Sequence, residues 1–135
     1  MEPLSSDALR AVALWSSANL LLMLALGLMV SRLRIQLGQA VGLGGDARLE
    51  RAVRAHGNNT EYVPGALLLL LLAAATGHSI SMLHVAGGAL FAARVLHAIG
   101  IQQREQRLPP ARAVGNVATW GITLWLGVAV LVSSF

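Results

Sequence analysis

The chain has 135 residues, of which 56% are hydrophobic and only 12% are charged. Soluble domains carry about 25% charged residues, so this composition excludes a cytosolic globular enzyme and a disordered tail. All ten basic residues are arginine, the net charge is +4, and there is no cysteine. The chain therefore has no disulfide and no thiol of its own, and we expect a single integral membrane domain over residues 1–135.

Long runs without charge predict the first and last membrane spans. A spanning helix needs about 20 apolar residues. Here 21 uncharged residues separate Arg10 from Arg32, and 23 follow Arg112. We predict a first helix over 8–33 and a fourth over 112–134. Acids precede the first apolar run and arginines follow it, which favours a retained helix over a signal peptide.

The second predicted helix, residues 48–76, joins a polar half to an apolar half. Asp46 stands directly before it as the expected N-cap. The polar half ends at Glu61, and Leu, Ala and Val dominate after it. Pro64 lies at the junction, where it can kink the helix. We therefore expect the first half of this helix to stand in the headgroup region or in water.

A tight turn at 77–79 and two prolines, Pro109 and Pro110, bound a third predicted helix over 80–103. The predicted fold class is therefore an all-α integral membrane protein, a bundle of four transmembrane helices. The two arginine-rich links, between the first and second helices and between the third and fourth, fall on one membrane face. The positive-inside rule assigns that face to the cytoplasm, which puts both termini on the other side.

Five polar side chains share one face of the second predicted helix, within about 100° of one another at 100° per residue. An ionisable group at membrane depth usually points inward or at water and has a partner. The face has separate places for a carboxylate, an ammonium and a peptide amide, which fits a small zwitterionic ligand with more than one carboxylate. Alternatively, Arg54, Asn58 and Glu61 pair with one another and with Arg94, and only hold helices together. The five residues are Arg51, Arg54, Asn58, Glu61 and Tyr62.

The run RAHGNNTEYVP, from Arg54 to Pro64, resembles the signature of the MAPEG superfamily, the membrane-associated proteins of eicosanoid and glutathione metabolism. The Arg-x-x-x-Asn-x-x-Glu spacing, the aromatic residue, the proline and the place on the second of four helices all agree. The resemblance extends through Arg94 and His97, and it is strongest to the small bacterial branch and to microsomal glutathione transferase. It implies a homotrimer in a bacterial inner membrane, with glutathione bound between neighbouring subunits near the cytoplasmic face.

The polar face and the resemblance together give the expected glutathione-binding side chains. His56 lies about 140° from Arg51 at 100° per residue, so it faces a neighbouring helix or a neighbouring subunit. The resemblance implies that it reaches the site of the adjacent subunit. Family members with transferase chemistry carry tyrosine where this chain has His97 and Ile101, and Ile101 cannot donate a hydrogen bond, which leaves room for a different thiol. The expected set is Arg51, Arg54, His56, Asn58, Glu61, Tyr62, Arg94 and His97.

Glutathione chemistry needs the thiolate, and a guanidinium close to the sulfur favours that charged form. The resemblance places such an arginine just after the third helix, where Arg104 and Arg107 compete and Arg107 lies nearer to the aligned position. Arg32 resembles a second arginine, which acts from the neighbouring subunit on the electrophile or leaving group. Alternatively, these arginines serve only as positive-inside anchors.

The predicted function is a glutathione-dependent transferase or peroxidase that acts on hydrophobic electrophiles or lipid hydroperoxides. Glutathione is the expected co-substrate, membrane lipid surrounds the protein, and neither a metal nor a nucleic acid is expected as a partner. The alternative is a non-catalytic lipid-binding or scaffold member of the same fold. A small multidrug-type transporter would carry its carboxylate deep in the first helix, but residues 8–33 contain no acid.

Overall fold

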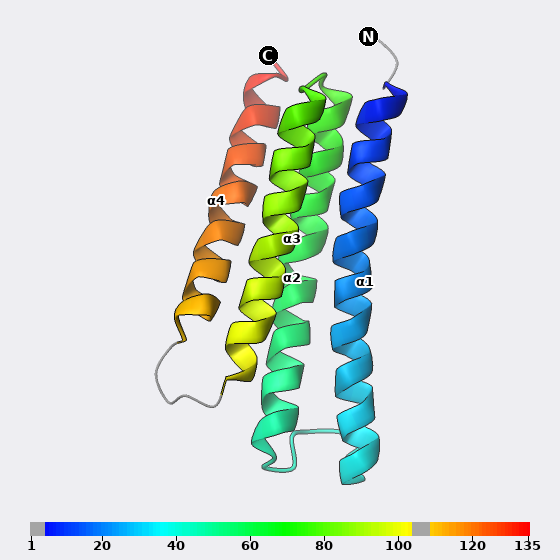
Figure 1. Cartoon of the computed structure of the whole chain (residues 1–135), viewed down its shortest axis with the longest axis vertical. Coiled ribbons are helices and arrows are strands. Elements are labelled where there is room, and N and C mark those ends of the chain that lie inside the picture. The colour runs from blue at the N-terminus through cyan, green and yellow to red at the C-terminus, as the bar shows by residue number, and fades with distance from the viewer. Residues whose placement is uncertain (1–4, 104–108) are drawn as a thin grey trace.

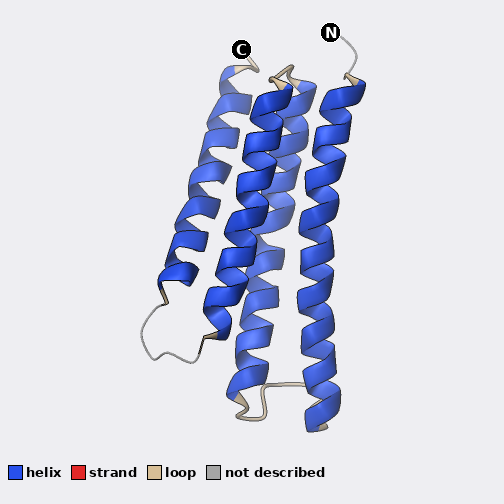
Figure 2. Cartoon of the chain, in the orientation of Figure 1, coloured by secondary structure: helices blue, strands red, loops and turns tan. Residues whose placement is uncertain are grey.

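The computed structural model describes residues 5–103 and 109–135 as four helices that run along one axis (Figures 1 and 2). Each boundary lies within four residues of its predicted position, so the predicted all-α, four-helix fold is confirmed. The helices are α1 (Ser6–Leu37), α2 (Ala47–Ala75), α3 (Ile80–Gln102) and α4 (Pro110–Val132).

Helices α2 and α3 form the centre of the bundle. In the described part of the chain, α1 and α4 each pack against both central helices but not against each other. Small and branched apolar residues fill the centre, such as Ala66 and Leu70 of α2 and Leu90 of α3, all of them buried. The outer helices expose apolar side chains such as Leu21 and Leu124. An apolar outer face of this extent suits hydrocarbon rather than water.

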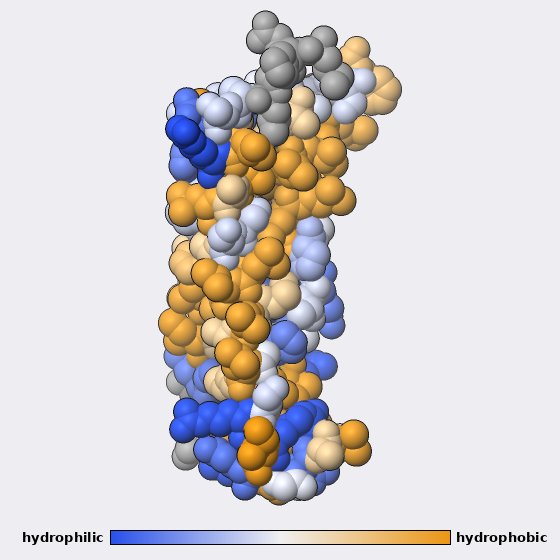
Figure 3. Space-filling model, turned by 90° about the vertical axis from the view of Figure 1, so that its right-hand side faces the viewer, coloured by the Kyte–Doolittle hydropathy of each residue, from blue (hydrophilic) through white to orange (hydrophobic). Residues whose placement is uncertain are grey.

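Three of the helices, α1, α3 and α4, are long and apolar enough to cross a membrane. Helix α2 has 29 residues and a polar first half, and it runs beside the other three (Figure 1). Its length of about 43 Å, at ~1.5 Å per residue, exceeds a hydrocarbon core of about 30 Å. In a view of one side of the molecule, hydrophobic residues cover much of the middle and hydrophilic residues gather at the lower end (Figure 3).

Helix α1 continues four residues beyond its predicted end, and hydrogen bonds from Arg34 hold the connection to α2 against its last turn. Gly38 ends the helix with a left-handed φ of 62°. The Arg34 guanidinium donates hydrogen bonds to the carbonyl of Gln39 at 3.3 Å and to that of Gly42 at 2.9 Å. Arg34 therefore does not end the helix, which continues to Leu37.

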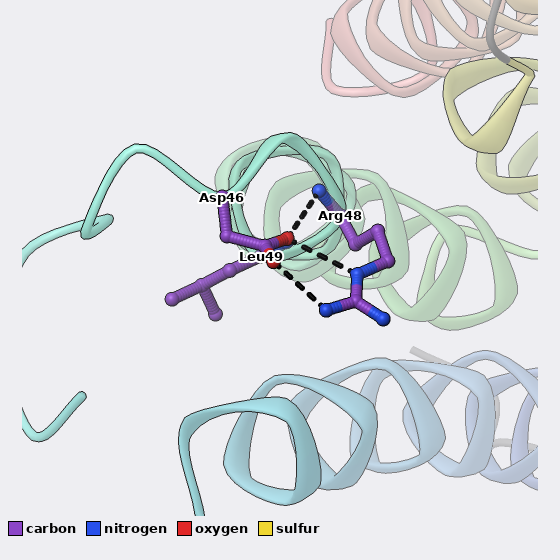
Figure 4. A network of polar contacts seen from close by, with 3 residues as sticks. All are labelled: Asp46, Arg48 and Leu49. Atoms are coloured by element: carbon purple, nitrogen blue, oxygen red, sulfur yellow. Dashed lines mark hydrogen bonds and ion pairs between the residues drawn. The ribbon is translucent and has the colours of Figure 1, made fainter. Parts of the chain in front are cut away.

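Asp46 caps α2 as predicted. Its carboxylate accepts the backbone N–H groups of Arg48 at 2.8 Å and Leu49 at 3.2 Å, and it pairs with the Arg48 guanidinium at 2.9 Å (Figure 4). The hydrogen bond from the Arg48 side chain, followed by the one from the Leu49 backbone, holds the pKa of Asp46 well below its ordinary value.

Two glycines let α4 approach the backbone of α3. A Cβ atom added at Gly100 would clash with the backbone nitrogen of Arg112, and one added at Gly115 would lie 2.6 Å from the carbonyl oxygen of Ala93. Real Cβ atoms essentially never come this close to a neighbour. The first turns of α4 are therefore fixed against the end of α3, and we call this contact the glycine seam.

Candidate functional site

A pocket of about 270 Å³ opens between α2, α3 and α4, near the end of the bundle where the chain links α1 to α2 and α3 to α4. Its wall contains two guanidiniums, a carboxylate, an amide and an imidazole. The lining residues are Val53, Arg54, Gly57, Asn58, Glu61, His97, Ile101 and Arg112.

Helix α2 supplies the charged wall of the pocket. Arg54, Asn58 and Glu61 follow one another at spacings of four and three residues, so they lie on one side of the helix. Arg54 and Glu61 are both exposed. Within residues 5–103 and 109–135 the ion pairs are Arg10 with Asp7 and Arg48 with Asp46. The described structure thus does not close Arg54 and Glu61 into a pair with each other.

Arg94 lies behind the pocket rather than in its lining. It is fully buried and donates hydrogen bonds to Asn58 Oδ1 at 2.7 Å, His97 Nδ1 at 3.1 Å and Thr119 Oγ1 at 3.3 Å. These contacts join α2, α3 and α4. The alternative interpretation of the polar face, as glue between helices, therefore describes the Arg94–Asn58 contact well.

His97 and Ile101 form the α3 wall, and both are buried. Ile101 gives this wall an apolar patch without hydrogen-bonding capacity. Helix α4 contributes Arg112 to the lining. This side chain is half-buried, and its Nε is enclosed without a hydrogen-bond partner among the described residues.

Arg112 is not among the site residues predicted from the sequence. There it marks the boundary of a charge-free run and is one of the arginines of the link between the third and fourth helices. A usable signal was present, since proline is favoured at the first position of a helix. With Pro110 starting α4, Arg112 falls in the first turn, and the glycine seam holds that turn against α3.

Tyr62 belongs to a second hollow. It lines an apolar groove of about 430 Å³ together with residues of α4. Glu61 and Tyr62 are adjacent in the chain, so the polar pocket and the apolar groove lie on neighbouring sides of α2. The α4 residues of the groove are Trp120, Thr123, Leu124, Gly127, Val128 and Leu131.

The remaining predicted site residues lie outside the lining of the pocket. His56 packs against α1, with its Cε1 atom 3.2 Å from the position of a Cβ at Gly27, so it faces a neighbouring helix of the same chain, one of its two predicted environments. Arg51 is half-buried with its Nε enclosed and without a described partner, and Arg32 is exposed on α1.

The two favoured catalytic candidates, Arg104 and Arg107, lie outside the described residues. In the part of the chain that is described, no group of three or more His, Asp or Glu side chains could hold a metal ion. The donor set of the pocket is instead suited to organic anions, because guanidiniums form charge-assisted hydrogen bonds with carboxylates. Glu61 adds one place for an ammonium group.

The fold and the pocket define a helical membrane protein with a polar, predominantly cationic site at one end of its bundle. The sequence matches the MAPEG family over residues 12–132, and the chain belongs to this family. It is 38% identical over 108 residues to "Inner membrane protein YecN" of Escherichia coli strain K12, an overlap that covers 80% of each chain. The same figures hold for the protein of that name in Escherichia coli O6:H1. The family resemblance of the RAHGNNTEYVP run is thereby confirmed.

Proposed function

We propose that this protein is a glutathione-dependent membrane enzyme that acts on hydrophobic electrophiles or lipid hydroperoxides. The observation that carries the proposal is the pocket in which Arg54, Arg112 and Glu61 face one cavity without an ion pair to one another. Its volume of about 270 Å³ is close to the lower end of the ~300–1,000 Å³ typical of ligand pockets.

The polar groups of glutathione are complementary in charge and hydrogen bonding to the side chains that line this pocket. The tripeptide has two carboxylates, one ammonium, two amides and a thiol. Arg54 and Arg112 would bind carboxylates or the sulfur, Glu61 would bind the ammonium, and Asn58 would bind an amide or a carboxylate. Each charged group of the ligand would then meet a charge of opposite sign.

The pocket would activate the thiol electrostatically. A guanidinium within ~4–6 Å of the sulfur lowers the pKa of the thiol by about 1–3 units. Arg112 is the described candidate for this role, beside the sequence candidates Arg104 and Arg107. Arg32 remains the proposed second arginine, acting on the electrophile from a neighbouring subunit.

Two reactions of the thiolate are open. In transfer, the sulfur attacks an electrophilic carbon, a C–S bond forms, and the leaving group departs with its electron pair. In peroxide reduction, the sulfur takes the terminal oxygen, the O–O bond breaks, and the alkoxide takes a proton to become an alcohol. A second glutathione then displaces water from the oxidised sulfur and leaves glutathione disulfide.

The apolar groove supports a lipophilic co-substrate. It begins at Tyr62, next in the chain to Glu61 of the pocket, and its other lining residues are mostly apolar. A hydrophobic compound in this groove would enter from the bilayer, while glutathione would enter from the aqueous side. The groove would hold the apolar part of the substrate and leave its reactive part near the pocket.

We place the protein in a bacterial inner membrane as a homotrimer, with the pocket on the cytoplasmic side and both termini on the other. The name of the Escherichia coli relative and the gathering of arginines at one end of the bundle support this location. Native mass spectrometry in detergent tests the trimer. A periplasmic reporter fused to the C-terminus tests the orientation, and an inactive fusion would overturn it.

Calorimetry with glutathione tests the proposed function. Detergent-purified protein is expected to bind glutathione saturably, and Glu61→Gln is expected to weaken binding strongly because the ammonium loses its partner. Glu50→Gln, an exposed acid in the first turn of the same helix, is the matched control and should bind normally. Absence of binding by the wild-type protein at millimolar glutathione would refute the proposal.

The second candidate function is lipid binding or scaffolding without catalysis. The apolar patch at Ile101 favours it, because this side chain offers the ligand no hydrogen bond. Assays with an aryl halide and with cumene hydroperoxide separate the two functions. Consumption of neither compound by protein that binds glutathione would favour the non-catalytic role.

A further inference from the structure

We propose that Arg94 is a positioning residue that fixes which hydrogen-bonding atoms the pocket presents. By occupying the acceptor atoms of Asn58 and His97, it turns their N–H donors toward the ligand and makes the pocket selective for anionic, acceptor-rich molecules. Only the choice of glutathione as the probe rests on the proposed function.

The Arg94 guanidinium donates hydrogen bonds and accepts none. The 2.7 Å contact from Arg94 Nη2 therefore fixes the oxygen of the Asn58 amide on the Arg94 side. The Asn58 NH₂ group is then the end left for the pocket, which Asn58 lines.

Arg94 also fixes the position of the proton on His97. Because Arg94 Nη2 can only donate, His97 Nδ1 must accept at 3.1 Å and carries no hydrogen. A neutral imidazole then holds its proton on Nε2. His97 lines the pocket, so it offers an N–H donor there rather than an acceptor.

The third contact of Arg94 limits its freedom to turn. The Thr119 hydroxyl donates to the carbonyl of Gly115 at 2.7 Å, so its oxygen is free to accept from Arg94 Nη1 at 3.3 Å. All three acceptors are uncharged, and within residues 5–103 and 109–135 Arg94 forms no ion pair. Its positive charge is thus balanced by no described carboxylate, and it adds a favourable potential for an anion in the adjoining pocket.

The pocket therefore presents donors on three walls. Arg54 and Asn58 donate from α2, His97 from α3 and Arg112 from α4, whereas Glu61 is the one carboxylate among the lining residues. Such a wall selects ligands with several anionic groups and at most one ammonium. Esterification of the carboxylates should remove much of the affinity, although it changes the shape of the ligand little near the thiol.

The first experiment measures the tautomer of His97 without any ligand. Protein labelled with ¹⁵N in histidine is observed by NMR in micelles, and the His97→Gln variant assigns the signal. We expect a protonated Nε2 and a bare Nδ1 in the wild type and in Thr119→Val, and a mixture of tautomers in Arg94→Met. A protonated Nδ1 in the wild type would overturn the inference, even if Arg94→Met fails to fold.

The second experiment measures binding of glutathione and of its diethyl ester by calorimetry. Asn58→Asp keeps an acceptor for Arg94 but replaces the N–H donor by an oxygen, and we expect affinity for glutathione to fall by about tenfold or more. The ester should bind the wild type at least about tenfold more weakly than glutathione. Equal binding of ester and acid, or of wild type and Asn58→Asp, would refute the selectivity.

The two experiments also separate this inference from the proposed function. A wild type that binds no glutathione but shows the Nε2–H tautomer refutes the proposed function and retains the role of Arg94. A wild type that binds glutathione but has His97 protonated on Nδ1 refutes the role of Arg94 and retains the proposed function.

Discussion

Two polar clusters on α2 differ in whether the chain itself completes their hydrogen bonds. At the first turn, the Asp46 carboxylate accepts two backbone N–H groups and pairs with Arg48 (Figure 4). Further along the helix, about two turns on at Arg54 and about four turns on at Glu61, the side chains share a pocket with Arg112 and form no ion pair among the described residues. A charge whose partners lie in the chain stabilises structure, whereas a charge left open toward a cavity is available to a ligand.

The largest expected effect comes from removing a charge of the pocket. Arg54→Ala should weaken glutathione binding by about 10- to 150-fold, the equivalent of ~1.5–3 kcal/mol for hydrogen bonds to a charged group. The thermal midpoint should stay nearly unchanged because Arg54 is exposed. Calorimetry and thermal denaturation measure the two quantities.

Arg48→Ala is the matched control for this change. It removes an arginine of the same helix whose partner is Asp46, so it should lower the thermal midpoint slightly and leave glutathione affinity intact. An equal loss of glutathione affinity in Arg54→Ala and Arg48→Ala would contradict the view that only the pocket arginine is available to a ligand.

The next largest effect is expected on the stability of the contact between α3 and α4 that positions Arg112. Gly115→Ala forces a Cβ against the carbonyl oxygen of Ala93, and overpacking of this kind costs about 1–3 kcal/mol. Gly121→Ala on the same helix meets nothing within 4 Å and should be neutral or stabilising. Thermal denaturation in detergent compares the two, and equal midpoints would contradict the tight seam.

A smaller effect should appear in the acidity of bound glutathione. Arg112→Ala is expected to raise the pKa of the bound thiol by about one unit, since a nearby guanidinium stabilises the thiolate. The ultraviolet absorbance of the thiolate, followed against pH, measures the change, and Arg112→Lys should restore part of it. An unchanged pKa would assign the role to the Arg104 or Arg107 candidates instead.

The smallest effect is expected for the cluster of Asp46 and Arg48 at the start of α2. The pKa of Asp46 is lowered from its ordinary value of 3.8, so its charge stabilises the fold above about pH 4 and this contribution fades as the pH falls further. Asp46→Asn keeps a capping oxygen but loses the charge. The wild type should therefore melt slightly higher than the variant at pH 7, and the gap should narrow below pH 4. A difference in melting temperature that widens on acidification would contradict a stabilising charge on Asp46.

The helices were predictable because hydrophobic runs, an N-cap and prolines each leave a local mark in the sequence. Asp46 and Pro110 mark helix starts by known capping preferences, and the structure follows them. Helix α1 ends four residues beyond its predicted end, because the charge of Arg34 in the sequence does not show that its side chain bonds the following loop.

The site was predictable only in part. Helical periodicity shows which side chains share a face, but it does not show which part of that face lines the pocket. The predicted face held Arg54, Asn58 and Glu61, which do line the pocket, and also Tyr62, which lies in the groove at the other edge. Pro110 signals that Arg112 lies in the first turn of α4, but the place of Arg112 in the pocket depends on the contact between α3 and α4, which leaves no local mark in the sequence. The roles expected for Arg104 and Arg107 stay predictions.

The glycine seam ties the backbone of Arg112 to the packing of α4 on α3. Contacts at Gly100 and Gly115 lie on either side of Arg112, so the close approach of the two helices holds this part of α4 in place. Insertions, deletions or substitutions in that loop should therefore be tolerated by the binding wall. Such changes are expected to leave Arg54, Glu61 and Arg112 around the same pocket.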